Sequence, residues 1–173
     1  MDSGNTGKRR RFHPENSVRC WRNKEYVVNY HRMTSPCGLD CFNCPMYLAN
    51  EDAGLRAGIS EKLGLPDEKA RCEGCRNAHG TIAFLGSTEP CDVFRCTDRK
   101  GVTFCFECSD FPCDHLYPYA DQASMRQHNT KLFNLCLIKR MGLQPWAERK
   151  AKSVKDVYFN GKLRVHSTEK TPT

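Results

Sequence analysis

Ten cysteines fall between positions 37 and 113, and they constrain the fold more than any other feature of this 173-residue chain. They stand in close groups, in which two to four residues separate neighbouring cysteines. The groups are Cys37-x3-Cys41-x2-Cys44, Cys72-x2-Cys75, Cys91-x4-Cys96 and Cys105-x2-Cys108-x4-Cys113. Two thiolates at such a spacing can reach one ion from a tight turn, and thiolate sulfur suits tetrahedral zinc. The pattern therefore predicts bound metal, with these ten cysteines as candidate ligands.

The segment that carries the cysteines has little else to stabilise it. Glycines and prolines recur between residues 66 and 118, and few apolar residues stand between them. A loop-rich stretch of this length cannot bury enough apolar surface to offset the entropy lost on ordering it. We therefore expect a small, metal-stabilised, Cys-rich, α-rich irregular domain with a C-terminal helical hairpin.

Helical patterns flank the cysteine groups. From Pro45 to Leu63, apolar residues recur at steps of three and four, and Gly64 offers a C-terminal stop. Residues 132–138 form a dense apolar run that ends near Gly142, and Pro145 suits the first turn of a following helix. These two helices are the predicted hairpin. Cys136 lies within the apolar run, so we expect it to be a buried core thiol and not a ligand.

The expected organisation has three parts. Residues 1–32 carry the basic cluster from Lys8 to Arg11 and read as a disordered basic N-terminal extension. Residues 33–163 form the Cys-rich metal-binding domain, with the metal-site region at 37–113 and the hairpin at 120–160. Residues 164–173 form a flexible tail.

The charge pattern argues against a nucleic-acid surface around the cysteines. The chain has a formal net charge of +7, yet residues 33–118 hold thirteen acidic and eight basic residues, which is the wrong sign for binding phosphate. No stretch approaches the roughly 18 apolar residues of a transmembrane helix, and no export signal is recognisable. We expect a cytoplasmic protein with reduced thiols and no membrane contact, for which an unidentified protein partner stays open.

Ten thiols do not divide into four-coordinate sites without a remainder. Two such sites leave two cysteines, which could form a redox dithiol, join His79 or His115 in a third site, or leave one site with an open position. Structural zinc is the first expectation and an iron–sulfur cluster is the alternative, because thiolate-rich sites serve both. Cys37-x3-Cys41-x2-Cys44 has the spacing of radical S-adenosylmethionine enzymes, but Asn43 stands where those enzymes usually carry an aromatic residue.

Four segments resemble a bacterial and archaeal Cys-rich family known as domain of unknown function 3795. They are SPCGLDCFNCPMYLA (35–49), CEGCR (72–76), KGVTFCFECSDFPCDHL (100–116) and HNTKLFNLCLIKRMGLQPWAE (128–148). The resemblance covers about residues 33–163 and implies a small metal-binding cytoplasmic protein of prokaryotic type. Eight of the ten cysteines match its motifs, whereas Cys91 and Cys96 lie between motifs.

The predicted function is metal binding, with zinc as the cofactor, by a protein that acts as an interaction or accessory module. The alternatives are an iron–sulfur redox or electron-transfer protein and a nucleic-acid-binding accessory protein that uses its basic ends. No phosphate loop, HExxH motif or Ser-His-Asp arrangement is present in the sequence, so we assign no catalytic residue and lean against an enzyme.

Overall fold

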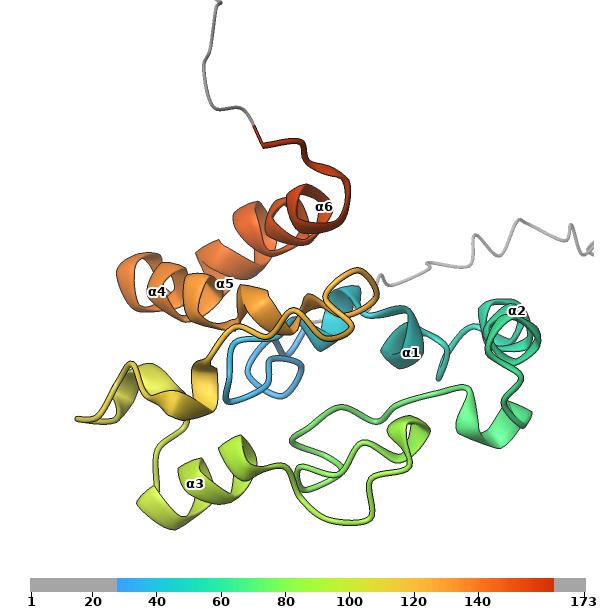
Figure 1. Ribbon diagram of the computed structural model, residues 1–173, viewed down its shortest axis with the longest axis horizontal. Coiled ribbons are helices and arrows are strands. Elements are labelled where there is room, and N and C mark those ends of the chain that lie inside the picture. The colour runs from blue at the N-terminus through green and yellow to red at the C-terminus, as the bar shows by residue number, and fades with distance from the viewer. Residues whose placement is uncertain (1–27, 164–173) are drawn as a thin grey trace, which may run out of the picture.

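The computed structural model describes residues 28–163, and within that range it consists of short helices joined by loops (Figure 1). No strand is present there; an isolated antiparallel bridge joins Thr34 and Asp40. The α-helices are α1 (Pro45–Leu48), α2 (Ala53–Leu63), α3 (Asp92–Lys100), α4 (Lys131–Met141), α5 (Leu143–Trp146) and α6 (Lys152–Asn160). The prediction of an α-rich irregular fold is confirmed for the described residues.

The first predicted helix is interrupted. It begins at Pro45 as expected, but α1 ends at Leu48, and α2 begins after Asp52, whose side chain accepts a hydrogen bond from the Leu55 N–H at 2.9 Å. This N-cap starts a new helix because it satisfies an amide left free in the first turn. The predicted stop is confirmed, since Gly64 adopts a left-handed conformation with φ of 62°.

The C-terminal helices follow each other almost without a break. Gly142 separates α4 from α5, and a π-helical turn at Ala147–Ala151 joins α5 to α6. Trp146 is completely buried against Leu137, Ile138, Ala147 and Ala151. The predicted pair of helices is therefore present, but the second one starts at Leu143 instead of Pro145.

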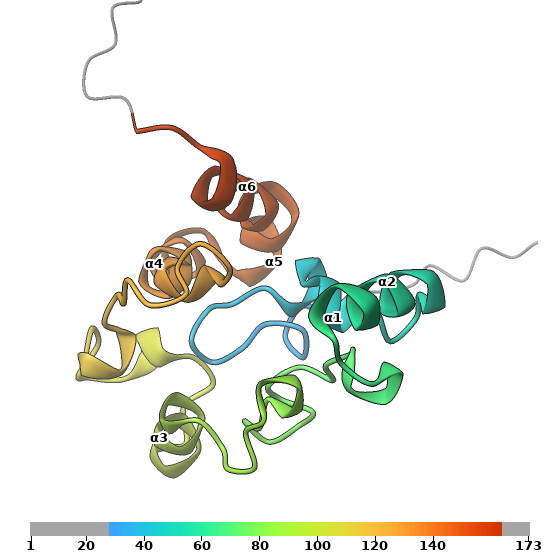
Figure 2. The ribbon, with the colours of Figure 1, turned by 45° about the vertical axis from the view of Figure 1, so that its right-hand side comes forward.

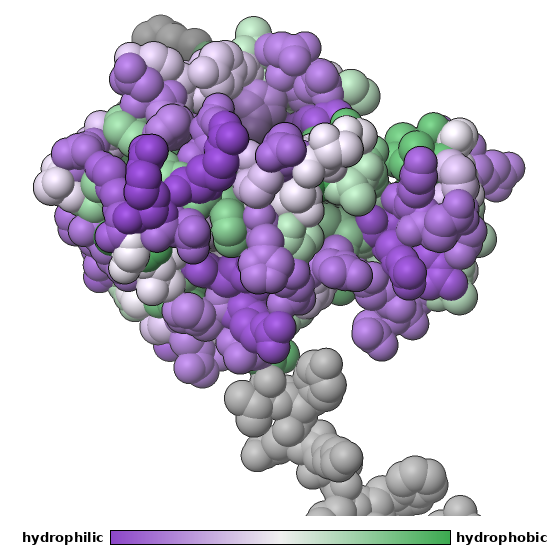
Figure 3. Space-filling model, turned by 90° about the horizontal axis from the view of Figure 1, so that it is seen from below, coloured by the Kyte–Doolittle hydropathy of each residue, from purple (hydrophilic) through white to green (hydrophobic). Residues whose placement is uncertain are grey.

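The segment that carries the first cysteines runs through the middle of the molecule. In Figures 1 and 2 the blue loop that precedes α1 lies between α4 to α6 on one side and α3 on the other. Cys37 and Leu135 meet there in an apolar core with Val93, Phe104, Cys105 and Leu116. Seen from below, hydrophilic residues cover most of the surface and hydrophobic residues form small separate areas (Figure 3).

The two predicted terminal segments lie largely outside the described residues. Residues 1–27 and 164–173 are not described, so the expected extension and tail are not tested there. Residues 28–32 belong to the described part. Tyr30 packs edge-on against Phe42 with ring centroids 5.0 Å apart, and the Arg32 guanidinium donates to the Asn77 side chain at 2.7 Å. Among the described residues, no helix has the length and apolar character needed to cross a membrane.

Candidate metal and thiol sites

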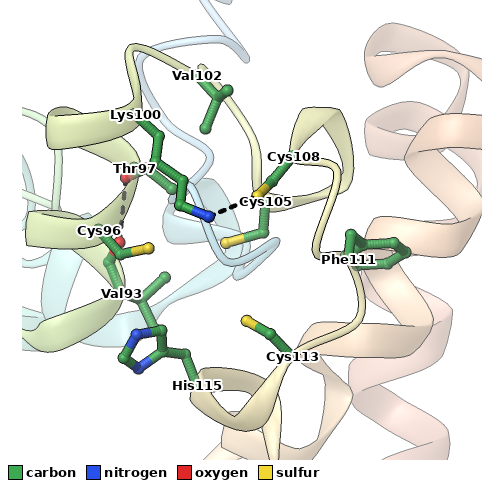
Figure 4. Close-up of a pocket in the computed structure, with 10 residues that line it drawn as sticks. All are labelled: Val93, Cys96, Thr97, Lys100, Val102, Cys105, Cys108, Phe111, Cys113 and His115. Carbon is green, nitrogen blue, oxygen red and sulfur yellow. Dashed lines mark hydrogen bonds between the residues drawn. The ribbon is translucent and has the colours of Figure 1, made fainter.

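Four cysteines surround one small cavity, which we call the first thiol set (Figure 4). Its members are Cys96, Cys105, Cys108 and Cys113. The cavity has a volume of about 20 Å³, and its apolar walls are Val93, Val102 and Phe111. This volume exceeds the roughly 10–15 Å³ that a water molecule requires, so the cavity between the thiols has room for about one small molecule or ion.

Local structure fixes each thiol of the first set. Cys96 projects from α3, while Cys105 begins the 3-10 turn Cys105–Glu107 and Cys108 follows it. The Glu107 carboxylate accepts hydrogen bonds from the N–H groups of Thr103 at 2.7 Å and Phe104 at 3.2 Å, which caps this turn. Cys113 precedes the next 3-10 turn, Asp114–Leu116.

The electrostatics of the first set divide it into an inner and an outer side. Burial raises the pKa of Cys105 to about 12, and the nearby thiols of Cys37, Cys113, Cys96 and Cys108 raise it further. The Asp110 N–H, 3.4 Å from the Cys108 sulfur, and the Lys100 ammonium, at 3.2 Å, lower the pKa of Cys108. Lys100 also pairs with the Asp110 carboxylate. The outer thiol is thus prepared to carry negative charge.

Three more cysteines gather around Cys41, and we call these four the second thiol set. Burial raises the pKa of Cys41 to about 12, and the thiols that add to this increase are Cys44, Cys72 and Cys37. The Cys72 N–H donates a hydrogen bond to the Met46 carbonyl at 2.8 Å. The Cys72 sulfur accepts a hydrogen bond from the Gly74 N–H at 3.4 Å. Gly74 has a φ of 82° and faces Tyr47 so closely that a Cβ would lie 3.1 Å from the ring. Only glycine fits this turn without strain.

The last two cysteines pair with each other. Both side chains are partly exposed, and each is the largest influence on the other's pKa: Cys91 raises the pKa of Cys75, and Cys75 lowers that of Cys91. Gly80 links their backbones, because its N–H donates to the Cys75 carbonyl at 2.8 Å and its carbonyl accepts from the Cys91 N–H at 3.1 Å. These two thiols also lie close to the second set, because Cys37 and Cys41 raise the pKa of Cys75 and Cys91 raises that of Cys37.

Arg76 connects the loops that carry the two sets. Its guanidinium donates to the carbonyls of Thr34 and Thr103, each at 2.8 Å, and lies 4.9 Å from the centre of the Phe104 ring. Its pKa is lowered by burial, while the thiols of Cys75, Cys41 and Cys37 and the Glu107 carboxylate oppose that shift. Arg76 thus places a cation close to a group of potential thiolates, as does Lys100, and as expected of metal–thiolate sites.

The thiols as placed surround a space and do not converge on one point. Among residues 28–163, no three or more histidine, cysteine, aspartate or glutamate side chains lie close enough together to hold a single metal ion. Four sulfurs about 2.3 Å from one tetrahedral zinc would lie about 3.8 Å from one another. Of the two histidines considered as ligands, His115 lines the cavity of the first set and His79 is exposed.

Two residues differ from what the sequence suggested. Cys136 was predicted to be buried, which is wrong: it is exposed, because α4 turns Leu135 and Leu137 inward and Cys136 to the surface. Asp40 is 1% exposed, although aspartate side chains ordinarily lie at the surface. Its carboxylate accepts hydrogen bonds from Asn43 at 2.8 Å and Gln127 at 2.7 Å. Gln127 is distant in sequence, so no pattern in the residues around Asp40 predicts this contact.

Comparison with known proteins places the cysteine region in a family. The model of the family described as "Protein of unknown function (DUF3795)" matches residues 33–118. The chain belongs to this family. The DUF3795 match contains all ten cysteines of the two sets and the pair, and it ends before α4. No curated protein and no solved structure matched the chain.

Proposed function

We propose that the protein holds a metal centre in each of its two four-thiol sets. The observation that carries this proposal is the first set, in which four thiols from residues 96–113 line one cavity with apolar walls. Burial and the neighbouring thiols raise the pKa of these groups, so the thiolate form that binds metal becomes favourable only where a cation shares it. Metal binding supplies that cation, and its free energy then contributes to folding a loop-rich segment.

We propose further that these centres are iron–sulfur clusters and not single zinc ions. A zinc ion draws four sulfurs to one point, whereas in a four-iron cluster each thiolate binds its own iron, so the sulfurs stay apart. Thiols that surround a cavity without converging suit the second case, provided that the loops move outward to admit the cluster, because a volume of about 20 Å³ holds about one water molecule. The zinc expectation uses the same ligands and is the alternative that metal analysis distinguishes.

The role that follows is that of an accessory electron-transfer protein. Cys37 of the second set and Cys105 of the first set belong to the same apolar core, and Cys37 is the charge with the largest effect on the Cys105 pKa after burial. Two clusters held by these thiols would lie on the two sides of one apolar core. That placement favours passage of electrons between them.

The test is anaerobic purification followed by measurement of iron, zinc, acid-labile sulfide and the visible spectrum. We expect a brown protein with iron and sulfide in equal amounts. Cys105→Ser should reduce the iron by about half, because it removes the most buried ligand of one set. Cys136→Ser is the matched control, since that thiol is exposed on α4 and belongs to neither set, and it should retain all the iron.

The outcomes separate the proposals. A colourless protein with about two zinc ions per chain, lost in part by Cys105→Ser, would refute the clusters and keep the two sets. A protein without metal, whose Cys105→Ser variant unfolds at the same temperature as wild type, would refute both.

A further inference from the structure

The Ser35 hydroxyl lies against the sulfur of Cys37, a thiol of the second set. The two atoms are 3.1 Å apart, and both side chains are buried, since Ser35 is 2% exposed and Cys37 is 7% exposed. The apolar core around Cys37 gives no reason for a hydroxyl at this place. A polar group that bonds to a candidate ligand is the kind of group that tunes a metal centre through that ligand.

The other contacts of the hydroxyl show which atom donates. Its oxygen accepts a hydrogen bond from the Leu39 N–H at 2.8 Å, so its own proton points elsewhere. The Leu39 carbonyl is 3.3 Å away and already accepts from the Ser35 N–H at 2.9 Å, whereas the Cys37 sulfur is nearer. A cysteine that binds metal has lost its proton and can only accept. A metal-bound Cys37 therefore takes the hydrogen bond that Ser35 donates.

Backbone hydrogen bonds keep the hydroxyl in this position. The Gly38 N–H donates to the Ser35 carbonyl at 2.9 Å, which helps to close the turn that carries the thiol. The Pro36 carbonyl accepts from the Cys105 N–H at 3.0 Å, and this bond connects the turn to the first set. The hydroxyl is thus held at the sulfur before any metal binds, so donation to a thiolate requires no rearrangement.

From this geometry we propose that Ser35 is a positioning residue of the second metal centre, whose hydroxyl donates to the Cys37 thiolate and raises the reduction potential of the cluster held there. The inference rests on the proposed function, because it needs a metal-bound Cys37. A reduced cluster carries one more negative charge than an oxidised one, and its potential depends on hydrogen bonds to its sulfurs. Such a bond stabilises the more negative state, and it does so more strongly at a buried site than in water.

The test measures the reduction potentials of both centres in anaerobically purified protein. Two changes at one position separate the hydroxyl from the shape of the side chain, because Ser35→Ala removes the hydroxyl and Ser35→Thr keeps it. We expect Ser35→Ala to lower one potential by about 59 mV, which is a tenfold change in the equilibrium constant of a one-electron reduction. Ser35→Thr should stay near wild type. The potential that moves should be the one that remains in Cys105→Ser, which removes a ligand of the first centre.

Ser109→Ala provides the comparison for the loss of a hydroxyl elsewhere in the thiol region. Ser109 also stands beside a cysteine, but its hydroxyl donates to the Asp110 carboxylate at 3.1 Å. The potential that Ser35→Ala lowers should keep its wild-type value in this variant.

The outcomes distinguish this inference from the proposed function. Unchanged potentials in an iron-containing Ser35→Ala would overturn the role of the hydroxyl and leave the clusters standing. The same holds if Ser35→Ala and Ser35→Thr shift alike or lose iron alike, because the shape of the side chain would then be what matters.

Zinc in place of iron would refute the clusters, and a chelator then tests the hydrogen bond. Ser35→Ala should lose one zinc ion about 10–100-fold more readily than wild type, and Ser35→Thr should not. Equal loss from all three proteins would overturn the hydrogen bond. A protein without any metal would refute both the proposed function and this inference.

Discussion

Replacement of Asn134 by leucine should destabilise the protein more than its small change in volume suggests. Asn134 is 2% exposed on α4, and its amide joins three parts of the fold. Its Nδ2 donates to the Gly38 carbonyl at 3.0 Å and to the Thr130 hydroxyl at 3.4 Å, while its Oδ1 accepts from the Trp146 indole N–H at 3.3 Å. Leucine has a similar shape and replaces none of these bonds.

The magnitude follows from the groups left without a partner. The Trp146 N–H is a single donor in a completely buried side chain, and the Gly38 carbonyl lies beneath α4. Each buried group that loses its only partner costs about 1–3 kcal/mol, so the expected loss is about 2–6 kcal/mol in the free energy of unfolding. That is a large part of the roughly 5–15 kcal/mol that a domain of this size possesses.

The assay is denaturant unfolding followed by circular dichroism, on samples with the same measured metal content. Trp146→Phe in the Asn134→Leu background removes the orphaned donor, and we expect this second change to cost less than Trp146→Phe costs in the wild type. Additive losses in the double variant, or a loss below 1 kcal/mol for Asn134→Leu alone, would show that the network does not stabilise the fold.

Three further predictions concern the thiol region. Gly80→Ala should lower the free energy of unfolding by about 2–5 kcal/mol, because it adds a clash with Phe94 to the strain of a positive φ. Gly64→Ala, which has a positive φ but open space, should lower it by about 1–2 kcal/mol. Equal losses of the two variants in thermal unfolding would contradict this. Burial raises the pKa of Asp40 above its ordinary 3.8, so the native state keeps this proton at a higher pH than the unfolded state does. The free energy of unfolding should therefore fall as the pH rises from the unfolded-state pKa through the native-state pKa. This dependence on pH should be weaker in Asp40→Asn, which a series of unfolding curves would measure. Lys100→Met removes a cation from Cys108, and we expect metal loss to a chelator to become up to about 10–100-fold easier, with Lys62→Met unchanged.

The helices could be predicted where their signals are local. Pro45, Gly64 and Gly142 mark helix ends in the structure as they do in the sequence. The interruption after Leu48 was missed because its signal, Asp52 as an N-cap, stands inside a stretch whose apolar spacing continues across it. Burial of Asp40 was missed for a different reason, since its partner Gln127 lies 87 residues away.

The exposure of Cys136 shows the limit of apolar patterns. Residues 132–138 are apolar almost throughout, so the pattern does not say which side of the helix faces the core. The core contact of α4 is set by Gly38, which has a φ of 86°. The Cys37 loop packs so closely against α4 there that a Cβ at Gly38 would lie 3.0 Å from the Leu135 side chain. That contact brings Leu135 inward and leaves Phe133 and Cys136 outside.

The spacing of the cysteines in the sequence identifies candidate ligands but does not say which of them belong to the same site. Cys91-x4-Cys96 shows why. The two residues look like one ligand pair in the sequence, yet Cys91 caps α3 and Cys96 lies within it. A helix rises 1.5 Å per residue, so five residues separate their backbones by about 7.5 Å along the axis. Cys91 therefore reaches Cys75 at one end of α3, and Cys96 reaches the cavity of the first set at the other. Five residues of regular helix place these two residues at opposite ends of α3, so their spacing in the sequence does not make them ligands of one site.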